Sequence, residues 1–124
     1  MYYEKLALEV GATVAGLTVV KPARITGNSG VEQKFTFVAG DGPEMYGFDV
    51  YPEVGQVEML RAYVKKMDTD ARVYVVCLSG RPNDGAKELA KNYGIEILGP
   101  REVGDFFSKR IALQIEARRV AATS

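Results

Sequence analysis

The sequence contains no histidine, and this absence excludes several kinds of active site. Zinc sites built on histidine, Ser-His-Asp triads and histidine general bases all require an imidazole. The single cysteine, Cys77, lies in an apolar run with no histidine to activate it, so we expect a buried, unreactive thiol. Any acid-base or metal chemistry must therefore come from Asp, Glu, Lys or Tyr side chains.

Long apolar segments are also missing. No run approaches the roughly 18 apolar residues that a membrane span requires, and the first residues lack the basic start and apolar core of a signal peptide. We therefore expect a cytoplasmic protein that makes no membrane contact. With 124 residues, of which 47% are hydrophobic and 26% charged, the chain has the size and composition of one globular domain. We expect a single domain over 1–124, with a core over about 1–100 and a C-terminal helix over 102–122.

The formal net charge is zero, which argues against a general nucleic-acid coat protein. The charge is nevertheless distributed unevenly along the chain. Residues 1–60 carry 4 Lys and Arg against 8 Asp and Glu, a net charge of −4, whereas residues 61–124 carry 12 against 8, a net charge of +4. This distribution favours an acidic region beside a basic surface.

Hydrophobic periodicity predicts nine elements in the order α-β-β-β-α-β-α-β-α. Apolar spacing of three and four residues predicts the helices, whereas alternating or continuous apolar runs between turn residues predict the strands. An antiparallel hairpin is followed by two strands reached through helices, which favour parallel pairing. The predicted fold is therefore a mixed α/β sheet covered by helices on both faces. The helices are expected at 2–10, 55–67, 84–93 and 102–122, and the strands at 17–20, 31–38, 45–51, 72–78 and 95–98.

Three segments in this order resemble the catalytic domain of the PD-(D/E)XK nuclease superfamily, most closely its Mrr-type restriction endonucleases. The segments are Val-Gly-Gln-Val-Glu at 54–58, Val-Val-Cys-Leu-Ser-Gly at 75–80, and Asp-Gly-Ala-Lys-Glu-Leu-Ala at 84–90 followed by Tyr-Gly-Ile-Glu-Ile-Leu at 93–98. With the hairpin, the resemblance covers roughly residues 26–107. It implies a restriction-endonuclease-like core with three α/β/α layers.

The resemblance also implies positions for a nuclease site. In that superfamily an Asp, then a Glu and a Lys separated by one residue, hold Mg²⁺ and activate water. The matching positions here are Glu32, Asp49 and Tyr51, so all three residue types differ from the family pattern. Glu32 and Asp49 would be the Mg²⁺ ligands if catalysis is retained.

A physical argument supports the same site. If the loop 39–44 joins the two hairpin strands, Lys34 pairs with Asp49 and Glu32 pairs with Tyr51. All four side chains then lie on one face, because side chains alternate along a strand. Lys34 would replace the missing catalytic lysine. The alternative is a solvent-exposed ladder of ion pairs, worth under about 1 kcal/mol per pair.

Basic residues provide candidate phosphate contacts. A loop before a helix N-terminus, such as the one that holds Arg81, can bind anions. The basic residues near the ends of two helices are equally well explained by the helix dipole. The candidate nucleic-acid-binding residues are Lys65, Lys66, Arg81, Lys109, Arg110, Arg118 and Arg119.

The C-terminal helix has apolar residues on more than one face. Phe106, Leu113 and Val120 repeat every seven residues, and a second face contains Phe107, Ile111 and Ile115. One face would pack on the sheet and the other on a partner, which makes a homodimer a candidate assembly.

Three hypotheses follow from these patterns. The first is a nuclease-fold protein, non-catalytic or weakly active, that binds nucleic acid, with DNA favoured over RNA. The second is a Mg²⁺-dependent DNA endonuclease with a rearranged site at Glu32, Lys34, Asp49 and Tyr51. The third is a small protein-interaction subunit that uses its C-terminal helix.

Overall fold

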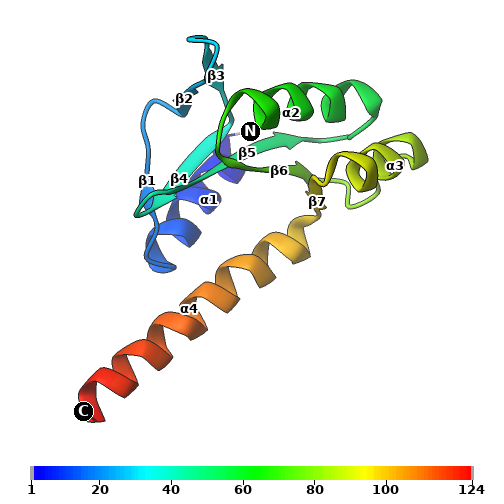
Figure 1. Cartoon of the computed structure of the whole chain (residues 1–124). Helices are drawn as coiled ribbons and strands as arrows, with labels where there is room; N and C mark the ends of the chain where they lie inside the picture. Colours follow the sequence, from blue (N-terminus) through cyan, green and yellow to red (C-terminus); the bar gives the residue numbers. More distant parts are fainter. Residues whose placement is uncertain (1, 124) are drawn as a thin grey trace.

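The computed structural model describes residues 2–123 and has the mixed α/β architecture that the sequence predicts (Figure 1). Within these residues, the helices are α1 (Tyr2–Val14), α2 (Gln56–Asp68), α3 (Asp84–Tyr93) and α4 (Pro100–Thr123). The main sheet contains β1 (Thr18–Val19), β4 (Phe37–Asp41), β5 (Glu44–Tyr51), β6 (Arg72–Cys77) and β7 (Glu96–Leu98). A small second sheet contains β2 (Arg24–Thr26) and β3 (Glu32–Lys34).

The main sheet has the strand order β1-β4-β5-β6-β7 and changes direction in its middle. β1, β4 and β5 pair antiparallel, whereas β5, β6 and β7 pair parallel. α2 connects β5 to β6 and α3 connects β6 to β7, because parallel neighbours need a long crossover connection. β6, which covers most of the strand predicted at 72–78, lies between β5 and β7, the interior position that a continuous apolar run favours.

The sheet is the middle of three layers. On one face, α1 and α4 cover a core that includes Leu8, Phe48 and Phe107. On the other face, α2 and α3 cover a second core that includes Met59, Val75 and Ala86. Residues alternate between the two cores along β5 and β6, because successive side chains of a strand point to opposite faces.

The first helix is longer than the sequence predicts. We expected it to end at Gly11, but α1 continues through this residue to Val14. Gly11 lies against the ring of Phe107, and a Cβ there would come within 2.8 Å of the ring. The glycine is therefore explained by close packing of α1 on α4. The left-handed residue that follows the helix is Gly16, with φ of 81°.

The predicted strand 31–38 is two strands, so the predicted order of nine elements is wrong in this region. β3 leaves the main sheet and pairs with β2, a strand that the sequence analysis missed. β4 begins at Phe37 and reaches Asp41, so the hairpin turn is only Gly42 and Pro43. Gly42 has φ of 61°, a conformation that suits glycine in a tight turn.

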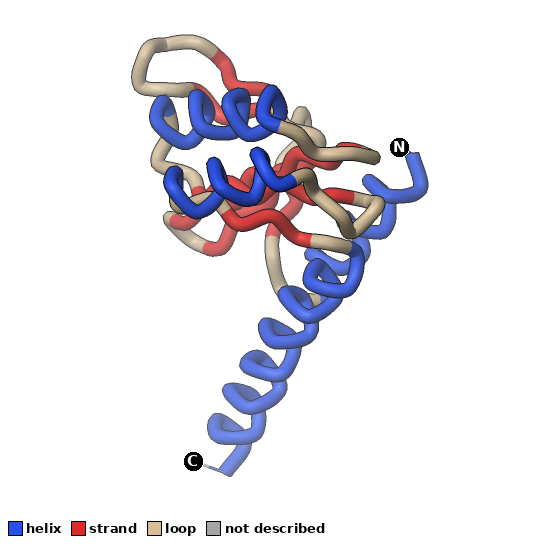
Figure 2. The backbone as a smooth tube through the Cα atoms, turned by 90° about the vertical axis from the view of Figure 1, so that its right-hand side faces the viewer, coloured by secondary structure: helices blue, strands red, loops and turns tan. Residues whose placement is uncertain are grey.

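α4 extends well beyond the layered domain. Its first turns pack on the sheet, and the remainder leaves the body of the molecule as a single straight helix (Figure 1, Figure 2). Every residue from 115 to 122 is exposed. Across residues 2–123, no helix combines the length and the hydropathy that a membrane span would need.

The apolar stripe that predicted α2 faces solvent. Val57, Leu60, Val64 and Met67 are 47–64% exposed, although such a stripe normally packs on the core. The buried side of the helix instead carries Met59 and Ala62. The periodicity predicted the helix correctly but gave no indication that this apolar face is exposed.

Neighbouring residues of α2 test this orientation. We expect Met59→Ala to lower the free energy of unfolding by roughly 2–5 kcal/mol, because it removes a fully buried side chain. Leu60→Ala should change it by less than about 0.5 kcal/mol, because the side chain is 47% exposed. Urea unfolding of both variants at low protein concentration measures the difference. Equal losses would mean that α2 packs with a different face.

Candidate functional site

Asp49 is the most unusual residue of the main sheet, because it is a carboxylate in the core. It lies in the middle of β5 and is only 4% exposed. Its side chain points to the α2 face, since the flanking Phe48 and Val50 belong to the core on the α1 side. A buried carboxylate is costly unless it is paired and hydrogen-bonded.

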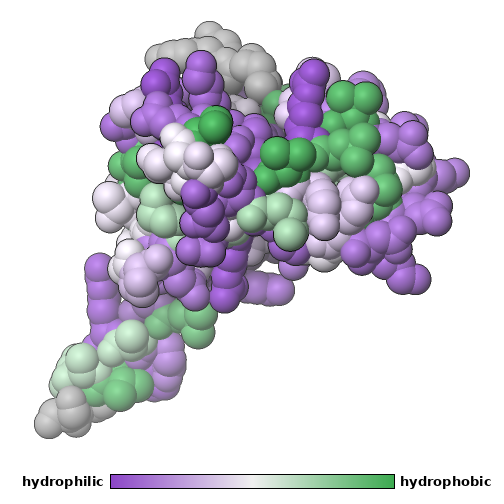
Figure 3. Space-filling view, turned by 45° about the horizontal axis from the view of Figure 1, so that its top comes forward, coloured by the Kyte–Doolittle hydropathy of each residue, from purple (hydrophilic) through white to green (hydrophobic). Residues whose placement is uncertain are grey.

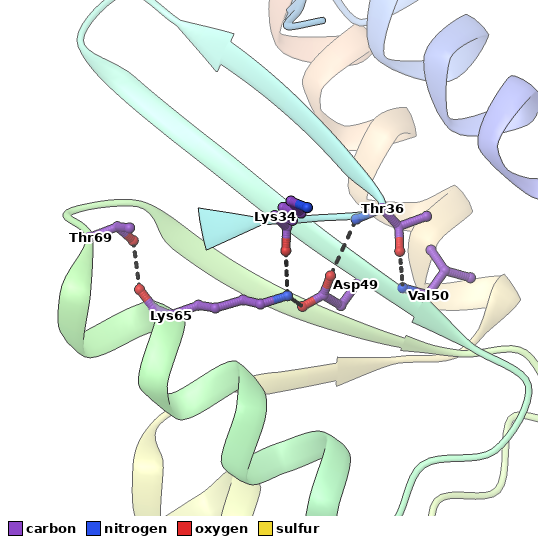
Figure 4. A network of polar contacts seen from close by, with 6 residues as sticks. All are labelled: Lys34, Thr36, Asp49, Val50, Lys65 and Thr69. Atoms are coloured by element: carbon purple, nitrogen blue, oxygen red, sulfur yellow. Dashed lines mark hydrogen bonds and ion pairs between the residues drawn. The ribbon is translucent and has the colours of Figure 1, made fainter. Parts of the chain in front are cut away.

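Both oxygens of Asp49 have partners (Figure 4). Oδ1 accepts a hydrogen bond of 3.2 Å from the backbone N–H of Thr36, and Oδ2 lies 2.7 Å from Nζ of Lys65 on α2. The Thr36 hydroxyl in turn accepts a hydrogen bond from the backbone N–H of Val50. Asp49 thereby holds the point where the chain passes from β3 into β4.

Lys65 is fixed by more than this ion pair. Its ammonium also donates to the backbone carbonyl of Lys34 and lies 4.9 Å from the centre of the Phe35 ring. The side chain is 18% exposed. Because three groups surround the ammonium, Lys65 is a structural cation that closes the Asp49 site, and a metal ion on Asp49 would have to displace it.

The predicted pairing of Glu32 and Lys34 with β5 is wrong. The observed register places Val38 opposite Gly47, so Thr36 rather than Lys34 lies beside Asp49. Glu32 is exposed and forms an ion pair of 3.2 Å with Arg24 on β2. The physical reason is the short turn at 42–43, which shifts the register by two residues, together with the departure of β3 from the sheet.

Tyr51 shares the α2 face of β5 with Asp49, as the sequence predicts. Burial raises the pKa of its phenol, and the negative charge of Asp49 raises it further. Arg61 lies close enough to donate a hydrogen bond that opposes this rise in pKa. Tyr51 is therefore a neutral phenol near pH 7, and it is not available there as a phenolate.

The predicted metal site has no ready-made ligand cluster among residues 2–123. No group of three or more acidic or cysteine side chains lies close enough together to hold a metal ion. Asp49 belongs to the main sheet and Glu32 to the small one. Mg²⁺ binding by this pair stays a prediction from the resemblance.

Four of the seven candidate phosphate-binding residues make contacts within the domain. Lys65 pairs with Asp49, and Lys66 donates to the backbone carbonyls of Tyr93 and Gly94 at the end of α3. Arg110 pairs with Asp41 and lies over the Tyr46 ring, and Arg119 pairs with Glu116. Within residues 2–123, the other three candidates, Arg81, Lys109 and Arg118, make neither an ion pair nor a side-chain hydrogen bond.

The sequence predicts Lys65 as a phosphate contact and gives no indication that it pairs with Asp49. The residue follows Ala62 by one helical turn, and this spacing would have placed it near the buried face if that face had been known. The sequence likewise gives no indication that the apolar face of α2 is exposed. Neither feature has a local sequence signal, because both depend on which side of α2 meets the sheet.

Comparison of the chain with protein-family models, with curated proteins and with solved structures finds no match in any of the three.

The Asp49–Lys65 pair provides a stability prediction. We expect Lys65→Met to cost roughly 3–5 kcal/mol, because it leaves a buried carboxylate without its cation. Adding Asp49→Asn should recover most of that loss, since the amide keeps the acceptor for Thr36 and removes the charge. Urea unfolding of both variants measures the effect. A Lys65→Met protein as stable as the wild type would show that the pair is not structural.

The same closure predicts the result of a nuclease assay. We expect no cleavage of duplex DNA above background with Mg²⁺ or Mn²⁺, because Lys65 occupies the face of Asp49 that a metal would need. A plasmid-nicking assay tests this, with Asp49→Ala as the matched control. Metal-dependent cleavage that Asp49→Ala abolishes would instead establish a rearranged active site.

Proposed function

We propose that this chain is a non-catalytic protein-interaction subunit that contacts its partner through the projecting part of α4. The observation that carries the proposal is the exposure of large apolar side chains on that helix. Leu113 is 70% exposed, Ile115 61% and Val120 55%. Leu113 and Val120 are seven residues apart and share one face of the helix, whereas Ile115 lies on the opposite face. Large exposed apolar residues that share a face are typical of a protein interface.

The first half of α4 is firmly attached to the domain. Phe107 is buried, and Phe106 packs its ring against Tyr46, Phe48 and Tyr74. Arg110 adds the ion pair with Asp41 at the hairpin turn. These contacts fix the direction in which the rest of the helix leaves the domain.

The second half of α4 gains little from its own domain. Gln114 is the last half-buried residue, and residues 115–122 are all exposed. Helices in proteins owe most of their stability to packing of an apolar face, and a short isolated helix is marginal in water. A protein partner that covers Leu113 would supply this packing.

Nucleic-acid binding is the second candidate function. It is favoured by Arg81, Lys109 and Arg118, which have no ion-pair partner within residues 2–123. It ranks lower because the other four candidate cations are engaged within the domain. Duplex binding that weakens with salt and with loss of Lys109 and Arg118 would support it, with DNA tested before RNA.

Site-specific photocrosslinking tests the proposed function. A photoreactive amino acid at position 113 should form covalent protein adducts when the chain is expressed in its own host. The same amino acid at position 112, an exposed alanine about a quarter-turn away, is the matched control and should form far fewer. Equal labelling at both positions, or none at 113, would contradict a role for this face of α4.

A further inference from the structure

The exposed face of α2 is the second large apolar surface of the molecule. Val57, Leu60, Val64 and Met67 are separated by three, four and three residues, which is the spacing of a coiled-coil seam. Figure 3 shows the corresponding patch of hydrophobic colour on the face where α2 lies. An apolar helix face with this spacing is suited to packing against another helix or in a hydrophobic groove.

This apolar stripe ends in negative charge. Asp68 and Asp70 lie at the C-terminus of α2, where anions are unfavourable because the helix dipole is also negative there. Hydrogen bonds from Gln33 and Ser29 lower the pKa of Asp68, so it keeps its charge at neutral pH. The cations nearest in sequence all have other partners: Lys65 and Lys66 make contacts inside the domain, and Arg72 pairs with Glu44.

A groove lies beside the acidic end of the stripe. It has a volume of about 420 Å³ and is lined by side chains of α2, of β3 and of the loop between β2 and β3. Ser29 and Gln33 hold the small sheet against α2 through Asp68. The lining residues are Ser29, Gln33, Tyr63, Val64, Met67 and Asp68.

We propose that the exposed face of α2 binds the projecting half of α4 from a second copy of the chain. This inference rests on the proposed function and names the partner. The projecting half of α4 carries Leu113, Ala117 and Val120 at spacings of four and three residues, which match the seam on α2. The apolar residues of the projecting half of α4 and those of the exposed face of α2 would then shield one another from water.

Charge complementarity supports the same pairing. Arg118 and Lys109 on α4 have no ion-pair partner within the described residues, and neither does Asp68 at the end of α2 or Asp70 just beyond it. Docking α4 beside the end of α2 places basic side chains near these acidic ones.

The proposed contact is heterologous, since each copy uses α4 on one side and α2 on the other. Such contacts form chains of subunits unless their rotation closes a ring. A single pair of short helices buries less area than most stable interfaces, so we expect assembly that depends on protein concentration and weakens with salt.

Two variants that each lack one of the two surfaces provide the decisive test. Val64→Glu destroys the α2 surface and Leu113→Glu destroys the α4 surface, at positions 58% and 70% exposed, so both should fold. In sedimentation velocity the wild type should form oligomers, and each variant alone should associate at least about tenfold more weakly. A mixture of the two should form a one-to-one dimer, because one variant retains α4 and the other retains α2.

The matched control variants introduce a glutamate at exposed positions outside the two proposed surfaces. Val14→Glu lies on the exposed face of α1, at a position 59% exposed, and Ala112→Glu lies on another face of α4. Both should associate like the wild type. Arg118→Glu should weaken association, and the loss should be smaller at high salt.

Three outcomes would overturn the inference: a wild type that stays monomeric at all concentrations, a mixture that fails to dimerise, or association that survives Val64→Glu. These outcomes remain distinct from failure of the proposed function. If position 113 crosslinks to a different protein while the purified chain is monomeric, α4 is an interface but α2 is not its partner. If position 113 forms no adduct and the chain is monomeric, both proposals fail.

Discussion

The ion pair between Asp49 and Lys65 joins parts of the chain that are far apart in sequence. Asp49 lies in the middle of β5, and Lys65 lies near the C-terminal end of α2. Through Thr36 and the carbonyl of Lys34, the same two side chains also hold the segment between β3 and β4. The pair thus sets which side of α2 faces the sheet and where the small sheet leaves the main one.

The orientation of α2 explains the most unusual surface of the molecule. Because Lys65 and Lys66 both reach inward, the face with Met59 and Ala62 is buried and the larger aliphatic residues are left in solvent. Because Lys65 and Lys66 are engaged elsewhere, neither of them forms an ion pair with Asp68 at the end of α2. A buried ion pair is weak evidence for stability as such, but it can select one packing arrangement over another. In this structure the pair occurs together with the arrangement that exposes Leu60 and Val64.

Much of the fold could be predicted from the sequence, because periodicity and turn residues are local signals. The run 73–78 is the interior strand that its continuous apolar character predicts, and the helices at α2, α3 and α4 begin and end within a few residues of the expected positions. The hairpin register could not be predicted, since it depends on whether Gly42 and Pro43 form the whole turn. The partner of Asp49 could not be predicted either, because Lys65 reaches it only after α2 has packed on the sheet.

The exposed face of α2 and the projecting half of α4 both carry large apolar side chains that do not pack in the core. We infer that contact with protein covers these two surfaces. Hydrogen exchange at increasing concentrations of the purified chain measures this most directly. The account predicts that the amides of residues 115–122 exchange rapidly in dilute solution and become protected as concentration rises, while those of β5 and β6 stay unchanged. Rapid exchange of 115–122 at every concentration would contradict self-association through α4.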